Sequence, residues 1–265
     1  MTTEAAPDPG TPRVFTAESP RRAASPPRIE SLRRAGSLRR AGSLPSAGRV
    51  LAVTARPLQE TADLGGLLYA FRRSGAELSL LCLTRGEAAE RNSGNERLEE
   101  ARPWEVQMAA SILGVGRFTV GDFRDGRLHR YRTLELAWRI ERAAKEYAAD
   151  LLLVVAPEIG DISDTSVARA AVATALQAGM PVAASTRSGV PGAWTVDLGD
   201  DARVARAIQK SAAAAHASQS EAVPELIGRL DRLGDTETLR WLLSPARIPA
   251  QRARSALRGA VGVYE

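Results

Sequence analysis

From Arg49 onward, short apolar runs alternate with segments in which apolar residues recur every three or four positions. Runs of the first kind predict buried strands, and spacing of the second kind predicts helices with one buried face. Strands are predicted at residues 50–53, 78–83, 118–120, 151–155, 181–184 and 195–198, the last at a sheet edge. Helices are predicted at residues 64–71, 103–113, 133–147, 166–178, 202–216 and 224–241. This alternation predicts an α/β fold: a three-layer, mostly parallel, doubly wound sheet.

Two expectations about helix starts accompany this pattern. Pro103 suits the first turn of its helix, and Thr133 suits an N-cap. The polar stretch 88–100 is expected to be a loop that folds over the functional site. Ligands of doubly wound folds bind beyond the C-terminal ends of the strands. That rule places the loops 55–60, 84–87, 122–128 and 156–164 on one rim.

Composition separates the first 48 residues from the rest. Residues 1–48 hold eight arginines against four acidic residues and seven of the fifteen prolines. Such a segment buries too little apolar surface to order itself, so a disordered basic Pro/Ser/Arg-rich arm is expected. A hexapeptide beginning at Ser31 repeats at Ser37. The arm is interpreted as solvated, or alternatively as a contact for an anionic or protein partner, membrane or nucleic acid.

The remaining chain divides into a domain at residues 49–243 and a basic C-terminal tail at 244–265. It contains no apolar run long enough for a membrane span, and its N-terminus has no apolar core of a secretory signal. The single cysteine, Cys82, lies in an apolar run and is expected to be a buried, inert thiol. A cytoplasmic protein without disulfides is therefore predicted. The sequence leaves the oligomeric state open.

Five segments in register carry a family resemblance. They are Ala55-Arg56-Pro57-Leu58-Gln59-Glu60, Leu83-Thr84-Arg85-Gly86-Glu87, residues 102–115 with Arg102 and Glu105, Asp125-Gly126-Arg127-Leu128, and Ala215-His216-Ala217-Ser218-Gln219. Together they resemble the PIG-L/LmbE family of zinc-dependent N-acetylglucosaminyl deacetylases, over about residues 48–243. The resemblance implies an LmbE-like fold.

The resemblance also implies where zinc chemistry would stand. In the family, the first loop reads Ala-His-Pro-Asp-Asp-Glu and a later motif reads His-Pro-Asp-His. The zinc-ligand positions match Arg56, Gln59 and Asp164, and the general-base position matches Leu58. Arginine cannot ligate a metal and leucine cannot accept a proton. The resemblance therefore predicts a degenerate member without catalytic residues, zinc or another cofactor.

Three interpretations of the altered site stay open. The Arg56 guanidinium could stand where the cation stood and pair with Asp161 or Asp164. Asp164 could instead simply cap the following helix. A hard-metal site built from Glu158, Asp161 and Asp164 is the third.

Four residues are candidates for contacts with a sugar-type ligand: Glu60, Glu87, Arg102 and Asp125. Arg102 could bind a sugar hydroxyl or phosphate, or form an ion pair with Glu99 or Glu105 on its own helix. Asp125 could equally serve the turn that it forms with Gly126.

Three functions follow as hypotheses. The first is a catalytically inactive binding or regulatory module that retains a sugar-type pocket. The second is an active hydrolase that removes N-acetyl groups from amino sugars or similar N-acyl compounds. The third is an interaction protein that binds an anionic partner through residues 1–48.

Overall fold

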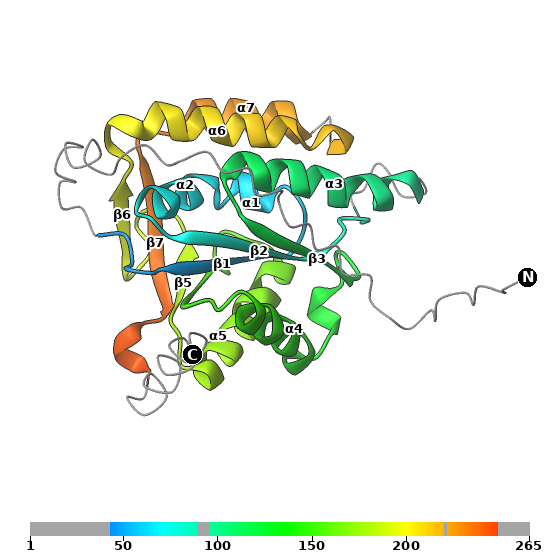
Figure 1. Ribbon diagram of the computed structural model, residues 1–265, viewed down its shortest axis with the longest axis vertical. Helices are drawn as coiled ribbons and strands as arrows, with labels where there is room; N and C mark the ends of the chain where they lie inside the picture. Colours follow the sequence, from blue (N-terminus) through cyan, green and yellow to red (C-terminus); the bar gives the residue numbers. More distant parts are fainter. Residues whose placement is uncertain (1–42, 89–95, 220–221, 249–265) are drawn as a thin grey trace, which may run out of the picture.

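The computed structural model describes residues 43–88, 96–219 and 222–248. Within these ranges seven strands form one sheet, in the order β3-β2-β1-β4-β5-β7-β6 (Figure 1). The strands are β1 (Arg49–Thr54), β2 (Glu77–Thr84), β3 (Arg117–Phe123), β4 (Leu151–Val155), β5 (Val182–Ser185), β6 (Ala193–Asp197) and β7 (Thr236–Leu243). Strands β1 to β5 pair in parallel, whereas β7 pairs antiparallel with both β5 and β6.

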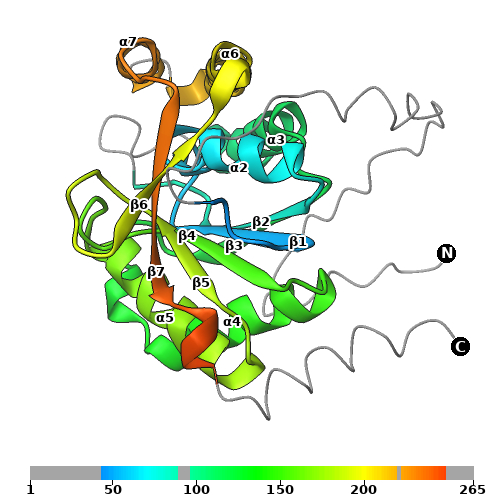
Figure 2. The same cartoon turned by 90° about the vertical axis from the view of Figure 1, so that its left-hand side faces the viewer.

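Helices cover both faces of the sheet, as Figures 1 and 2 show. One layer holds α1 (Gln59–Ala62), α2 (Gly65–Arg73), α3 (Glu96–Leu113), α6 (Ala202–Ala214) and α7 (Ala222–Asp231). The other holds α4 (Thr133–Glu146) and α5 (Ile162–Ala178). Short 3-10 helices are η2 (Leu128–Arg130), η3 (Gly199–Asp201), η4 (Ala217–Gln219) and η5 (Pro245–Arg247). The predicted three-layer, mostly parallel α/β fold is confirmed, with β6 at an edge.

Strand β1 divides the apolar interior in two. Val50 and Ala52 belong to the core beneath α2 and α3, whereas Leu51 and Val53 belong to the core beneath α4 and α5. Successive side chains of a strand point to opposite faces, so a central strand with helices on both sides must be apolar at every position. None of these four side chains is more than 1% exposed.

Two helices start well before their predicted first residue, and a third has a different N-cap. Helix α3 begins at Glu96, with Pro103 in its interior, so part of the predicted loop at 88–100 is helical. The error has a physical reason: residues 96–102 are polar but rich in Glu and Arg, which are strong helix formers. Helix α5 begins at residue 162 rather than 166, and α4 is preceded by Arg132 as N-cap rather than Thr133.

The predicted helical region at 224–241 is wrong in its second half. Helix α7 ends at Asp231, and residues 236–243 form β7. Thr236, Thr238 and Trp241 are residue types that favour strands. Their pairing with β5 and β6 depends on segments distant along the chain, which the local pattern does not reveal.

The ends of the described chain lie against the domain. Leu44 and Ala47 pack on the core, and the Trp194 indole donates a hydrogen bond to the Ser43 carbonyl at 3.2 Å. The predicted arm at residues 1–42 and the tail from residue 249 lie outside the described residues. In the part that the structure describes, no helix is long and apolar enough to cross a membrane.

Candidate functional site at the sheet rim

The strand order fixes where a ligand site belongs. The chain runs outward from β1 through β2 to β3, then returns to place β4 on the other side of β1. The crevice between the C-terminal ends of two such strands is the usual ligand site of doubly wound sheets. Here it lies between the loop after β1, residues 55–60, and the loop after β4, residues 156–161.

An ionic and hydrogen-bonded network joins these two loops. The Arg56 guanidinium forms an ion pair with the Asp161 carboxylate, and its Nη2 lies 3.6 Å from Oδ2 of Asp164. The Gln59 amide nitrogen donates to Oδ1 of Asp164 at 2.8 Å. Gln59 Oε1 accepts from the backbone N–H of Ala55 at 3.0 Å, which holds the side chain in place. Four predicted site positions thus meet, with Gln59 as the bridge between the loops.

Asp161 and Asp164 also begin α5. Asp161 is the N-cap: its Oδ1 accepts from the N–H of Ser163 at 2.7 Å and of Asp164 at 3.1 Å. Asp164, the third helical residue, accepts in return from the Asp161 N–H at 2.8 Å. This is a capping box. The expectation that Asp164 itself is the N-cap is wrong, because the cap lies three residues earlier. Helix capping and the Arg56 pair occur together.

The two carboxylates sit in different electrostatic surroundings. Burial raises the pKa of Asp161, but the hydrogen bond and charge of Arg56 and the N–H donors of Asp164 and Ser163 together lower it by more, so it lies below its usual value. Burial raises the pKa of Asp164, whose side chain is only 2% exposed, and its hydrogen bonds do not offset this. Burial lowers the pKa of Arg56, but Asp161 and Asp164 raise it further, so the guanidinium stays charged.

Leu58 belongs to an apolar cluster rather than to this network. It packs with Ala213 of α6 and with Leu226 and Leu230 of α7. Its backbone has φ 80°, a left-handed conformation that a leucine rarely adopts. Backbone strain of this kind persists only where surrounding contacts hold it. The loop after β1 is therefore fixed by packing on α6 and α7 as well as by Arg56.

The structure does not bring the proposed hard-metal ligands together. Glu158 accepts from the Thr186 hydroxyl at 2.8 Å and pairs with Arg240 of β7 at 3.0 Å. Among the described residues, no group of three or more His, Cys, Asp or Glu side chains could hold a metal ion.

A second half of the rim is formed by the loops after β2 and β3. The Asp125 N–H donates to Oε1 of Glu87 at 2.7 Å, and Asp125 Oδ2 accepts from the Ala88 N–H at 3.3 Å. Asp125 Oδ1 also accepts from the N–H of Gly126 at 2.8 Å. Asp125 therefore forms its turn and bridges the two loops. Oε2 of Glu87 is buried and has no partner in the described part of the chain.

Arg102 lies beneath this half of the rim. Its side chain is buried, and its Nε has no hydrogen-bond partner within the described ranges. A Cβ added to Gly86 would lie only 3.0 Å from Nη1 of Arg102 and from Cδ of Pro57. The missing side chain at residue 86 thus lets the guanidinium approach the first loop. Glu105 accepts from the N–H and hydroxyl of Ser218, both at 2.6 Å.

The fourth ligand candidate, Glu60, is enclosed. Its Oε1 lies 2.6 Å from Nε2 of His216, and both side chains are 0% exposed. The two residues are 156 positions apart. The motif match that contains His216 was the only sequence signal for this contact, and it did not indicate Glu60 as the partner.

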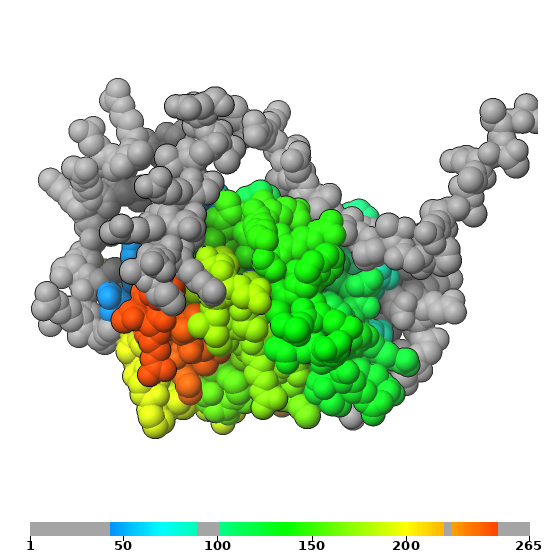
Figure 3. Space-filling view, turned by 90° about the horizontal axis from the view of Figure 1, so that it is seen from below, coloured from blue at the N-terminus to red at the C-terminus, as the bar shows by residue number. Residues whose placement is uncertain are grey.

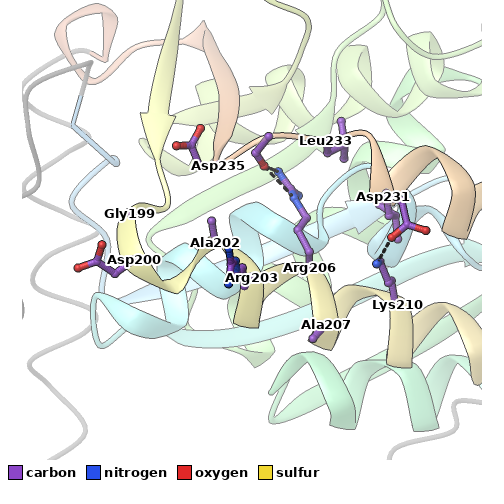
Figure 4. Close-up of a pocket in the computed structure, with 12 residues that line it drawn as sticks. Gly199, Asp200, Ala202, Arg203, Arg206, Ala207, Lys210, Asp231, Leu233 and Asp235 are labelled. Atoms are coloured by element: carbon purple, nitrogen blue, oxygen red, sulfur yellow. Dashed lines mark hydrogen bonds and ion pairs between the residues drawn. The ribbon is translucent and has the colours of Figure 1, made fainter.

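Two surface cavities lie away from the rim network. The larger, of about 940 Å³, lies between α6, α7 and the start of β7 (Figure 4). Its deepest cation, Arg206, pairs with Glu237 and donates to the carbonyls of Gly234 and Thr236, so its donors are occupied. The smaller, of about 300 Å³, is lined by Leu58, Ala62 and four residues of α7 and its end.

The fold and rim define a doubly wound α/β protein whose strand-end loops are joined by an ionic and hydrogen-bonded network. Residues 51–176 match the family model of the PIG-L GlcNAc-PI de-N-acetylases. The match covers a little under half of the chain, and over those residues the chain is similar to this family. A search of curated proteins finds no match.

Solved structures share the fold at low sequence identity. An N,N'-diacetylchitobiose deacetylase from Pyrococcus horikoshii is 16% identical, with a TM-score of 0.58, over 81% of this chain and 89% of that one. A teicoplanin deacetylase in a zinc-inhibited form is 15% identical, with a TM-score of 0.57, over 73% and 97%. A 4-carboxy-2-hydroxymuconate hydratase from Pseudomonas putida KT2440 is 16% identical, with a TM-score of 0.58, over 74% and 96%.

Proposed function

We propose that this protein is a catalytically inactive PIG-L/LmbE-like protein that binds a sugar-type ligand at the rim without zinc. The observation that carries the proposal is the network of Arg56, Gln59, Asp161 and Asp164. A guanidinium occupies the region in which the family resemblance puts the metal. A cation in that place compensates the two carboxylates without ligating anything.

The donor chemistry of the site does not fit zinc. Catalytic zinc sites have three protein ligands and an open water position. Of the three positions matched to ligands, Arg56 cannot coordinate a metal. The Gln59 amide already forms hydrogen bonds with Asp164 and with the backbone of its own loop. Leu58, at the matched position of the base, packs on α6 and α7. Neither Arg56 nor Leu58 can activate a water molecule as the matched family residues would.

The ligand contact of the proposal rests on the other half of the rim. A buried arginine with an unpaired donor and a carboxylate with one buried, unpaired oxygen are costly unless something binds them. Arg102 and Glu87 are such groups, and they lie on neighbouring elements that follow β2. Vicinal hydroxyls of a sugar both donate and accept hydrogen bonds, so they suit this pair.

Metal content tests the first part. Purified protein dialysed against zinc-containing buffer should carry far less than one zinc per chain by inductively coupled plasma mass spectrometry. A variant with Arg56→His, Leu58→Asp, Gln59→Asp and Asp164→His rebuilds the family's set and should gain zinc, which controls for an intact scaffold. Stoichiometric zinc in the wild type would overturn the proposal.

Ligand binding tests the second part. Amino sugars, N-acetylated sugars and sugar phosphates should be titrated by calorimetry against wild type and Arg102→Met. A charged hydrogen bond contributes about 1.5–3 kcal/mol, so the variant should bind about 10- to 100-fold more weakly. Arg203→Met, at an exposed arginine of α6, is the matched control and should bind normally. Equal affinities for all three proteins would contradict the assignment of Arg102.

An active N-deacetylase is the second candidate, favoured by the family model and by the deacetylases among the similar structures. Release of acetate from N-acetylglucosamine substrates, with and without added zinc, separates the two. Zinc-stimulated turnover that is lost in Arg56→Ala would support the active enzyme and sink the first proposal. Binding through residues 1–48 stays a prediction, which deletion of that segment would test.

A further inference from the structure

A basic and apolar surface lies at the start of the α4 layer. The segment from β3 to α4 carries four exposed arginines, Arg124, Arg127, Arg130 and Arg132. None of their side chains forms an ion pair with any residue in the ranges 43–88, 96–219 and 222–248. The acids of the same segment are Asp122, which is exposed, and Asp125, which is buried; the exposed Glu135 follows in the first turn of α4 and accepts from the Arg132 N–H. The exposed charge of the segment is therefore strongly positive.

Two large apolar side chains follow directly. Leu134 is 61% exposed and Trp138 is 59% exposed. They are four residues apart on α4, so they lie on the same face of the helix. The Arg142 guanidinium lies 5.9 Å from the Trp138 ring centre. We call Leu134, Trp138 and the four arginines the α4 patch. Figure 3 shows the face of the molecule on which α4 is exposed.

We infer that the α4 patch docks on an anionic membrane surface, an interaction independent of the proposed rim function. Tryptophan and leucine insert at the level of lipid headgroups, and arginines are attracted to anionic lipids. Both components occur here on adjacent turns.

Two other occupants fit the patch less well. The bases of single-stranded nucleic acids stack on aromatic side chains of the protein, and an aliphatic side chain such as Leu134 offers no ring for stacking. The Trp138 ring is also already in contact with Arg142. A second copy of the chain would bring the same four arginines together across a two-fold axis, where like charges repel.

Vesicle binding tests the inference with the full chain. Co-sedimentation should show binding to vesicles of phosphatidylcholine with 30% phosphatidylserine and little binding to phosphatidylcholine alone. Each basic residue near such a surface contributes about fivefold to partitioning. Reversal of two charges in Arg127→Glu/Arg130→Glu should therefore weaken binding at least about 30-fold. Leu134→Ser/Trp138→Ser should also weaken it.

Matched controls distinguish the patch from the basic segment 1–48, which every variant retains. Trp104 and Met108 form an equally exposed pair, 64% and 58%, on α3 of the opposite layer. Trp104→Ser/Met108→Ser and Arg203→Glu/Arg232→Glu should bind as the wild type does. Tryptophan fluorescence should shift to the blue on addition of anionic vesicles, in Trp104→Phe but not in Trp138→Phe.

Several outcomes would overturn the inference. One is binding of the patch variants at wild-type strength, which would assign all lipid affinity to other residues. Another is an absence of binding by the wild type. Loss of a dimer in the patch variants, seen by sedimentation equilibrium, would assign the surface to a second copy. Loss of RNA binding in those variants with vesicle binding unchanged would assign it to nucleic acid.

Discussion

Removal of the Arg56 charge should destabilise the protein by a modest, pH-dependent amount. In Arg56→Met the side chain keeps its volume, and the ion pairs to Asp161 and Asp164 are lost. The Arg56 and Asp161 side chains are 34% and 46% exposed, and such pairs contribute about 0.2–1 kcal/mol. Asp164 is almost fully buried but keeps its two N–H donors, so we assign about 1 kcal/mol to it, below the full penalty of a broken buried pair.

The sum is a loss of about 1–2 kcal/mol, which corresponds to a decrease in Tm of about 3–6 °C for a domain of this size. Arg73→Met is the matched control, because Arg73 pairs with Asp201 at 2.8 Å with both side chains about as exposed. It should lower the Tm by much less. Differential scanning calorimetry measures both.

The stability lost in Arg56→Met should depend on pH in a direction that the pKa shifts of Asp161 and Asp164 determine. Arg56 holds the pKa of Asp161 below its usual value, so the stability from this pair is present above the unfolded pKa of about 3.9 and is lost as pH falls through the folded pKa. The pKa of Asp164 is already raised by burial and rises further without Arg56. A buried acid with a raised pKa destabilises the folded state as pH rises through that pKa.

The Asp161 pair is still largely present at pH 4, which lies above the folded pKa of Asp161, so the Asp164 effect is what makes the deficit of Arg56→Met larger at pH 7 than at pH 4. Urea unfolding at the two pH values compares the variant with the wild type. A deficit that is unchanged by pH, or larger at pH 4, would refute this account of the network.

Two further predictions concern groups buried beneath the rim. The Cys82 thiol is 0% exposed, and burial strongly raises its pKa. Ellman's reagent should therefore label it only as fast as the protein unfolds. Labelling within seconds in native buffer would contradict this. Glu60→Ala should cost about 1–3 kcal/mol, because it leaves the enclosed His216 without its hydrogen bond. Chemical denaturation measures the loss, and Glu77→Ala, at an exposed residue, is the control and should stay within about 0.5 kcal/mol of the wild type.

The sequence predicted the parallel part of the fold well because most residues of β1, β2, β4 and β5 are apolar. Leu151–Val155, for example, is entirely buried and was bounded correctly. It failed at β7, whose identity depends on pairing with β5 and β6 rather than on its own pattern. The prediction also failed at the start of α3, because its polar residues suggested a loop although Glu and Arg favour helices.

The sequence predicted which loops form the candidate site, but only part of the contacts between their side chains. The rule for strand ends placed residues 56 and 161 on one rim, and the exchange of a metal for a guanidinium suggested their pairing. The bridge through Gln59 was not predictable, because it depends on a rotamer that points across the crevice. The contact of Glu60 with His216 joins residues 156 positions apart and has no local signal at all.

The two halves of the rim differ in how accessible their unpaired polar groups are. Between β1 and β4, Arg56 and Gln59 link the opposing loops, so a ligand there would have to displace an internal ion pair. Beyond β2 and β3, Arg102 and the half-buried Glu87 retain buried atoms without partners, whereas Glu60, which also has an unpaired oxygen, is 0% exposed and out of reach of a ligand. Binding free energy is gained where polar groups are unpaired and lost where they are already satisfied. A ligand of this protein should therefore bind beside Arg102, one strand away from the place at which the family resemblance puts the metal.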